Sequence, residues 1–274
     1  MPVSLQAGRG KESVAWLGSG LSHFVQWRQL QHRAYTEEST RLAIAHWVVK
    51  RKLNSYLNIC SELFPQRAGV AQQIAGSMEL IPATKSIASL MGLEGSTAAF
   101  WYRELGRLLL PHWQFQGRNR RPPRDPVNAL FSLGYTLALS AVRRQVNSSG
   151  LDPALGFLHE MAPARDALSL DLMEPLRANV DQFVLSLLDQ ILTPDDFTSI
   201  DNEGCRLRKE TRSLFYSAWE VASQNWREQN PIPIGVAHPD GEPYQYSPAS
   251  LNACCYQLIR DFRQELNEYV GKEN

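Results

Sequence analysis

The chain has 274 residues, of which 43% are hydrophobic, and it carries equal numbers of basic and acidic side chains, so its formal net charge is zero. These values are typical of a soluble globular protein with one large domain or two small ones, and the total charge does not indicate a polyanionic partner. The four cysteines form no CxxC pair and no zinc-type spacing with histidine, which favours a reduced, cytoplasmic setting.

Neither a signal peptide nor a membrane span is expected. The first residues lack the charged and apolar regions of a secretory leader. The longest uncharged run, residues 126–142, is slightly short for a membrane span and contains several polar side chains. We therefore predict a buried core helix there.

The N-terminal residues have the pattern of a β-hairpin. Residues 2–7 and 12–17 read as two short strands around Gly8-Arg9-Gly10. A two-stranded hairpin is at best marginally stable alone, so we expect these strands to belong to a sheet that the rest of the chain does not supply. After the first twenty or so residues, the pattern predicts an all-helical chain.

Apolar residues recur at helical spacing along most of the chain. The expected helices span residues 37–63, 72–80, 83–91, 97–110, 125–146, 180–192, 201–227 and 249–270. Thr36 and Ser96 are expected as N-caps, and residues 92–96 as a break, because Gly92 and Gly95 interrupt the helical pattern. The Pro- and Gly-rich residues 230–248 are expected to form a loop.

The segment 150–181 is the most informative part of the chain. It opens with Gly150-Leu151-Asp152-Pro153, where Asp152 could cap a helix that starts at Pro153. His159 follows an apolar run.

Two acids, Asp171 and Glu174, then lie three residues apart in an apolar sequence, which would place them on one face of a helix. Pro175 disfavours helical geometry at Glu174. Either the helix starts near Asp171, with Pro175 in its first turn, or it kinks at Glu174. Both alternatives place an acid at a helix irregularity, where a ligand can approach.

Each of these residues also has a simple structural interpretation. Glu94, between two glycines, could be an exposed loop glutamate, and His159 could be a hydrogen-bonded core histidine. Asp171 and Glu174 could pair with Arg165 or Arg177 on a partly exposed helix.

As a set, an imidazole and two or three carboxylates form a mostly hard-oxygen site, which suits manganese or magnesium more than zinc. Such an ion could polarise a phosphate oxygen and activate a hydroxyl or water. No GxSxG, GxxxxGK[ST] or GxGxxG motif occurs.

Local charge supports a phosphate-containing partner. The loop 117–124 holds four arginines with no acid before Asp125, which favours a contact with a DNA backbone. A second basic cluster, 206–212, has Glu203 and Glu210 close by and is more simply a solvated surface. The candidate DNA contacts are Arg118, Arg120, Arg121, Arg124, Arg165 and Arg177.

Four ordered motifs resemble one known family, the CRISPR-associated integrase and endonuclease family called "Cas one". The motifs are Leu93-Glu94-Gly95 with Ala98, Ala99 and Tyr102; Arg124-Asp125-Pro126-Val127-Asn128-Ala129-Leu130 with Gly134-Tyr135; Gly150-Leu151-Asp152-Pro153 with Gly156-Phe157-Leu158-His159-Glu160; and Asp171-Leu172-Met173-Glu174-Pro175-Leu176-Arg177 with Asp181. The resemblance covers roughly residue 2 to the C-terminus and is strongest over 94–192.

The resemblance implies that Glu94, His159 and Glu174 are metal ligands and that Asp171 supports the site. It also implies a manganese or magnesium cofactor and metal-dependent transesterification, in which a short DNA duplex (the prespacer) is inserted at the boundary of a CRISPR repeat. Nuclease activity is the hydrolytic side of the same chemistry. The expected partners are double-stranded DNA, a second copy of the chain and the small protein "Cas two".

The chain departs from this family at its N-terminus, where most of the family's β-sandwich is missing. Residues 1–20 are therefore expected to be the remnant of an N-terminal β domain, and residues 21–274 an α-helical, metal-dependent catalytic domain. The alternative is a truncated, catalytically incomplete DNA-binding relative or a fragment of a longer fusion protein.

Overall fold

The computed structural model describes residues 3–6, 13–17, 25–119, 122–200, 204–226 and 250–270. The first two segments are strands β1 (Val3–Gln6) and β2 (Ser13–Leu17), which pair antiparallel with Val3 opposite Leu17. The predicted N-terminal hairpin is thereby confirmed. The assignment of residues 1–20 to a separate β domain stays a prediction.

The rest of the described chain is mostly helical, which confirms the predicted fold class, but a second β-hairpin shows that the expectation of an all-helical chain after the first twenty residues was wrong. Its α-helices are α1 (Val25–Thr36), α2 (Glu38–Leu63), α3 (Ala68–Glu79), α4 (Ile87–Gly106), α5 (Pro126–Ser148), α6 (Ala167–Met173), α7 (Arg177–Leu187), α8 (Arg212–Gln224) and α9 (Leu251–Val270). Single 3-10 turns form η2 (Ile81–Ala83), η3 (Pro111–Trp113), η4 (Glu174–Leu176) and η5 (Pro194–Asp196), and a second hairpin pairs β3 (Phe197–Ile200) with β4 (Gly204–Leu207).

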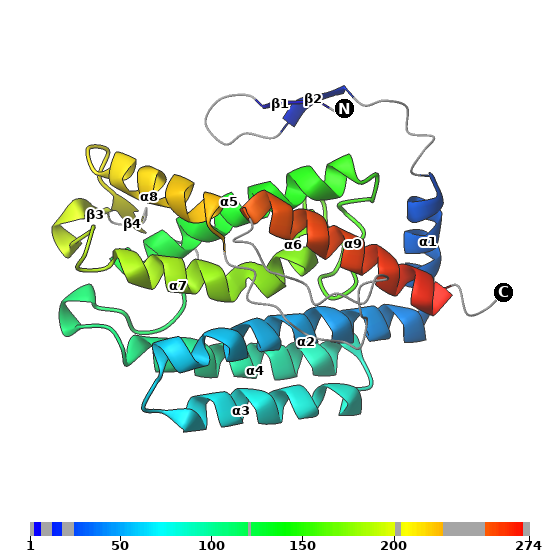
Figure 1. Cartoon of the computed structure of the whole chain (residues 1–274), viewed down its shortest axis with the longest axis horizontal. Helices are drawn as coiled ribbons and strands as arrows, with labels where there is room; N and C mark the ends of the chain where they lie inside the picture. The colour runs from blue at the N-terminus through cyan, green and yellow to red at the C-terminus, as the bar shows by residue number, and fades with distance from the viewer. Residues whose placement is uncertain are drawn as a thin grey trace, which may run out of the picture.

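Helix α2 lies between two groups of helices (Figure 1). It packs against α3 and α4 on one side and against η4, α7 and α9 on the other. Burial of residues such as Ile44, Val48 and Leu53 shows that more than one face of this helix is covered. A helix that is apolar around much of its circumference is buried by neighbours on several sides. The position of α2 lets side chains from both groups of helices meet at its surface.

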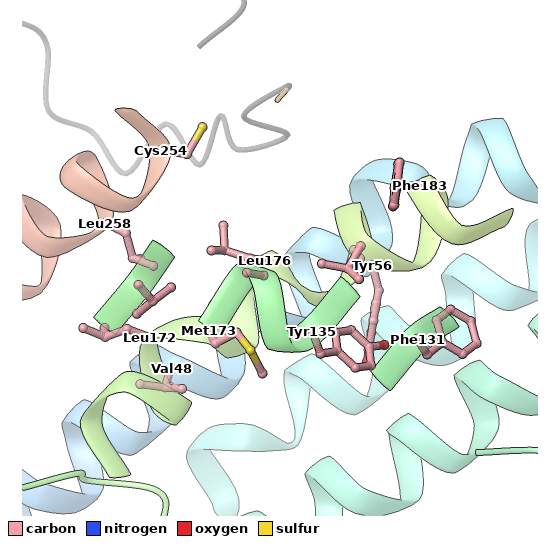
Figure 2. Close-up of a cluster of buried hydrophobic side chains, with 14 of the residues drawn as sticks. Val48, Tyr56, Phe131, Tyr135, Leu172, Met173, Leu176, Phe183, Cys254 and Leu258 are labelled. Carbon is pink, nitrogen blue, oxygen red and sulfur yellow. The ribbon is translucent and has the colours of Figure 1, made fainter. Parts of the chain in front are cut away.

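The core is continuous across these helices. Figure 2 shows part of it: Tyr56 of α2 lies close to Tyr135 of α5, and Val48 of α2 lies on the side of Leu172 and Met173 of α6. Tyr56 stacks on Trp101 of α4 with ring centroids 4.3 Å apart. Aromatic pairs of this kind add to the stability that area burial alone provides.

The start of α2 differs from the prediction. Thr36 was expected to cap this helix, but Thr36 is the last residue of α1, and its hydroxyl donates to backbone carbonyls one turn earlier. The N-cap is Glu37, whose carboxylate accepts the backbone N–H of Thr40 at 2.8 Å. A carboxylate at this position satisfies an unpaired N–H group and interacts favourably with the helix dipole.

Helix α4 runs without a break through residues 92–96, so the predicted break there was wrong. Ser86 caps the helix, and the predicted cap Ser96 lies in its interior, where its hydroxyl donates to the carbonyl of Leu93. Each glycine inside a helix costs roughly 1 kcal/mol, and burial of Leu90 and Trp101 on one face of α4 outweighs that cost. Glu94 therefore lies on a regular helix.

Helix α5 matches the expected core helix. Asp125 is its N-cap and accepts the N–H of Asn128 at 2.8 Å, and Pro126 is its first residue. Along the described parts of the chain, we find no helix with the length and apolarity needed to cross a membrane.

Two other expectations were wrong. Asp152-Pro153 was expected to start a helix, but the residues between α5 and α6 form a loop. The Gln31 side chain holds this loop, because it donates to the backbone carbonyl of Asp152 and accepts its N–H. The helix expected over 201–227 begins only at Arg212. Residues 204–207 form β4, whose Cys205 and Leu207 are buried while Arg206 is exposed. The predicted loop 230–248 lies outside the described residues.

One carboxyl in the core makes no salt bridge with any residue that the structure describes. Asp181 of α7 is fully buried and accepts hydrogen bonds from Trp101 Nε1, at 2.8 Å, and from the hydroxyl of Tyr135. The Tyr135 hydroxyl is also bonded to that of Tyr102. Burial raises the pKa of Asp181 to about 6, although both hydrogen bonds and the charge of Arg177 act in the opposite direction.

We expect Gly92→Ala to stabilise the protein by about 0.5–1 kcal/mol, because alanine restricts the unfolded chain and favours the helix. A Cβ at Gly92 would have no atom within 4 Å. Chemical denaturation measures the difference. A loss of stability would show that the backbone around Gly92 is not the regular helix described here.

We expect Asp181→Asn to change the pH dependence of stability. The folded pKa, about 6, lies above the ordinary 3.8, so only the folded protein keeps a proton on this carboxyl between those values. The associated stability is present below pH 3.8 and is lost as pH rises through 6. Relative to Asp181→Asn, the wild-type free energy of unfolding should fall by ~2 kcal/mol from about pH 4 to pH 7. Parallel denaturation profiles for the two proteins would contradict this assignment.

Candidate functional site

Asp171 of α6 organises the loop that precedes this helix. Its carboxylate is fully buried and accepts the backbone N–H groups of Phe157 at 2.5 Å, Leu158 at 3.0 Å and His159 at 2.9 Å. A buried carboxylate without such partners would be strongly destabilising. The three bonds satisfy its charge and fix the backbone immediately around His159.

The same carboxylate orients the His159 ring. Nδ1 of His159 lies 2.7 Å from Asp171 Oδ1, and Nε2 makes no hydrogen bond to any described residue. Burial would lower the pKa of His159, but the hydrogen bond and charge of Asp171 outweigh burial and raise it. The side chain is 25% exposed. An imidazole held by a carboxylate at one nitrogen, with the other nitrogen free, has the arrangement typical of a metal-ligating histidine.

The loop has further support from the first two helices. Gln31 of α1, which is fully buried, donates to the carbonyls of Asp152 and Leu155 at 2.9 Å and accepts the N–H of Asp152 at 2.8 Å. Arg41 of α2 donates to the carbonyl of Phe157. Sequence reasoning missed both residues, because a glutamine or arginine on an amphipathic helix is ordinarily on the solvated face.

Glu174 lies where α6 gives way to the 3-10 turn η4, with Pro175 in the second position of that turn. The helix does not start near Asp171, so the first predicted alternative was wrong, and the regular helix is interrupted at Glu174, as in the second. The side chain is 3% exposed, and Oε2 accepts from Arg177 Nε at 2.7 Å and from Lys52 Nζ at 2.5 Å. Burial would raise the pKa of Glu174, but Arg177 and Lys52 hold it well below its usual range.

Lys52 of α2 joins Glu174 to Glu94. Its ammonium group also donates to Glu94 Oε1 on α4, and the Lys52 side chain is only 4% exposed. The Glu94 side chain is 19% exposed, so the cluster opens toward solvent at Glu94 and His159 and is closed at Glu174. No pattern in the sequence singled out Lys52.

The structure thus brings the predicted residues together. Glu94 and Glu174 share one cation, and Glu174 and His159 are near enough for the charge of each to shift the pKa of the other. Within the described ranges, no three His, Cys, Asp or Glu side chains converge in a ready metal-binding arrangement, and the Lys52 ammonium lies between the two glutamates instead. The donor set itself, two carboxylates and an imidazole nitrogen, is chemically suited to a hard divalent ion.

Arg177 belongs to this cluster rather than to an exposed surface. The simple interpretation of Glu174 as an ion-pair partner of Arg177 is correct, but the pair is buried rather than partly exposed, because Arg177 is 4% exposed. Its guanidinium also lies over the Tyr135 ring, 4.7 Å from the centroid. Arg177 is therefore not accessible to a DNA backbone in this structure.

The other candidate DNA contacts are dispersed. Arg118 is half-buried and donates to Asn128 Oδ1 at 2.7 Å, which anchors the loop before α5 to that helix. Arg124 and Arg165 are exposed. Arg120 and Arg121 lie outside the described residues.

Among solved structures, this fold is shared by a casposase bound to integration product and by a partial Cas6-RT-Cas1–Cas2 complex. The casposase is 23% identical with a TM-score of 0.77, covering 98% of this chain and 72% of that chain. The complex is 22% identical with a TM-score of 0.80, covering 98% of this chain and 78% of that chain. These likenesses define the class of fold, a helical domain preceded by a β-hairpin.

The chain belongs to the family described as CRISPR associated protein Cas1, whose model matches residues 1–221. A similar protein is the CRISPR-associated endonuclease Cas1 3 of Thermus thermophilus, 38% identical over 210 residues, which cover 75% of this chain and 61% of that protein. The chain thus spans less than two thirds of the length of this relative. The resemblance inferred from the four motifs is confirmed.

We expect Gly156→Ala to destabilise the protein by about 1–3 kcal/mol, because overpacked sites force the backbone to move. A Cβ on Gly156 would lie 2.7 Å from the backbone and Cβ of Ala167, the first residue of α6. Chemical denaturation measures the loss of stability. Because Gly156 lies in the loop that carries His159, the same displacement should also disrupt the contacts of His159 with Asp171. Gly92→Ala is the matched control, since it adds the same methyl group in open space. Equal stability of the two variants would contradict the close approach.

Proposed function

We propose that this chain carries the catalytic domain of a metal-dependent DNA endonuclease and integrase of CRISPR adaptation. The observation that carries the proposal is the joining of Glu94 and Glu174 by one buried cation, next to a histidine oriented by Asp171. Membership of the Cas1 family supports it, since relatives are named CRISPR-associated endonucleases. In this proposal, residues 21–274 form the catalytic domain and residues 1–20 the end of a β domain.

Three donors would hold a manganese or magnesium ion: Glu94, Nε2 of His159 and Oε1 of Glu174. Oε1 accepts no hydrogen bond within the described chain, whereas Oε2 accepts hydrogen bonds from Lys52 and Arg177. When bound, the ion would polarise a phosphate oxygen and acidify an attacking hydroxyl or water. Asp171 keeps the proton of His159 on Nδ1, so that Nε2 stays available as a ligand.

The proposed reaction is a transesterification. The 3′-hydroxyl of a short DNA duplex forms a new P–O bond at the repeat boundary, the existing P–O bond breaks, and the proton of the attacking hydroxyl passes to the oxygen that leaves. Attack by water instead gives hydrolysis. The chain's own contribution is to hold the donors rigidly, since Glu94 is on a regular helix and Glu174 is buried.

The proposed partners are double-stranded DNA, as prespacer and repeat, a second copy of the chain, and the small protein Cas2. Solved structures with this fold are titled as a casposase with its integration product and as Cas1–Cas2 complexes. Exposed Arg124 and Arg165 and the half-buried Arg118 are candidate contacts to DNA phosphates. Arg120 and Arg121 are candidates from the sequence alone.

A second candidate function is that of a DNA-binding relative without turnover. One observation favours it, namely that both glutamates are engaged by Lys52 and no ready three-residue metal site exists in the described chain. This candidate predicts DNA binding that weakens steeply with salt and no cleavage with either ion.

The proposal is tested by cleavage of a labelled, branched DNA duplex with manganese, magnesium or chelator. We expect metal-dependent cutting that is abolished in Glu94→Ala, His159→Ala and Glu174→Ala. Asp171→Asn should reduce activity about 10- to 100-fold, the range typical of residues that orient a ligand. His32→Ala is the matched control, because His32 is exposed on α1 and its side chain makes no hydrogen bond or ion pair with the cluster residues.

Circular dichroism must show that each variant is folded. Cutting that persists in all three alanine variants would refute the proposal. Retained DNA binding without metal-dependent cutting by the wild type would favour the second candidate.

A further inference from the structure

Lys52 has an unusual position for a lysine. Its ammonium group is buried at the centre of the cluster and donates to a carboxylate on each side, Glu94 and Glu174. Helix α2, which carries Lys52, packs against both α4 and η4, the elements that carry these two acids. Lys52 is therefore the side chain that links the two proposed carboxylate ligands.

The charges of the cluster nearly cancel because of Lys52. Three carboxylates, those of Glu94, Asp171 and Glu174, face two cations, Lys52 and Arg177, which leaves one net negative charge with His159 neutral. Without Lys52, the cluster would have two net negative charges. Arg177 contacts Glu174 but makes no ion pair with Glu94. Two glutamates left without their shared cation would repel each other in a partly desolvated site.

We propose that Lys52 is the resident cation of this site, which holds Glu94 and Glu174 together in the metal-free protein and yields Glu94 when a divalent ion binds. This inference rests on the proposed function and deepens it. Lysine has a flexible stem and a compact charge, so Lys52 can withdraw from Glu94 and keep Oε2 of Glu174. That movement leaves Glu94, Oε1 of Glu174 and Nε2 of His159 for the ion.

Two opposite effects of Lys52 follow. It stabilises the metal-free protein, because it compensates two carboxylates in a site with little solvent. It also weakens divalent-ion binding, because an incoming ion must displace it from one carboxylate and then lies near a like charge. Lys52 is thus a positioning residue that sets metal affinity, and it touches neither DNA nor the reacting atoms in this proposal.

The test compares Lys52→Met with Lys50→Met, a control two residues away on the exposed face of α2. Isothermal titration with Mn²⁺ should show a dissociation constant at least tenfold lower for Lys52→Met than for wild type. The melting temperature of Lys52→Met should be reduced in chelator and largely restored by saturating Mn²⁺, since the ion replaces the missing cation. Lys50→Met should match wild type in both measurements.

Unchanged or weaker Mn²⁺ binding by Lys52→Met, or a loss of melting temperature that Mn²⁺ does not repair, would overturn the inference. If Lys52→Met does not fold in chelator, Lys52→Gln replaces it in the same measurements, because glutamine keeps two N–H donors without a charge. Folding of either variant only with Mn²⁺ supports the inference, and failure of both to fold even with Mn²⁺ overturns it.

Glu174→Gln separates this inference from the proposed function. If Glu174→Gln binds Mn²⁺ as tightly as wild type, the proposed metal site itself is wrong. If Glu174→Gln loses Mn²⁺ binding while Lys52→Met behaves as wild type, the proposed metal site is supported and the proposed role of Lys52 is wrong.

Discussion

The buried carboxylate of Asp171 is the constraint on which the site depends. Placed at the centre of a helical protein, it needs hydrogen-bond donors, and the chain supplies them from the backbone of Phe157, Leu158 and His159. This requirement folds the loop onto α6 and turns Nδ1 of His159 toward the same carboxylate. Satisfying one buried charge thus also positions the imidazole, so that the same bonds meet a demand of folding and a demand of the proposed function.

The second acid is handled differently. Glu174 is surrounded by cations rather than by backbone N–H groups, and Lys52 and Arg177 both bind its Oε2. Buried ion pairs add little net stability, because desolvation offsets most of their attraction. Under the proposed function, these ion pairs matter because they leave the second oxygen of Glu174 without a hydrogen bond and one side of Glu94 available to an ion. The fully buried Asp181 accepts hydrogen bonds from two neutral side chains, Trp101 and Tyr135, rather than from backbone N–H groups or a paired cation. Burial accordingly raises the pKa of Asp181 to about 6.

Elements that depend on local sequence signals could be predicted, whereas elements that depend on contacts between residues far apart in the sequence could not. Helical periodicity predicted α5 and α9 because their patterns are long and end at local signals such as Asp125-Pro126. The break expected at Gly92 and Gly95 was wrong because packing of α4 against α2 overrides local propensity. The loop at Asp152 was missed because Gln31, 121 residues earlier, holds it. The candidate ligands were found from family motifs, whereas Lys52 is defined only by the two helices and the turn that meet around it.

These differences bear on how the site is built. Glu94 was expected on a loop but lies on a continuous helix whose buried face includes Leu90 and Trp101, so its backbone cannot move without disturbing the core. His159, by contrast, lies on a loop that depends on Asp171, Gln31 and the absence of a side chain at Gly156. With Glu94 on a rigid helix and His159 held by Asp171, rearrangement around the proposed ion would fall mainly to the flexible stem of Lys52.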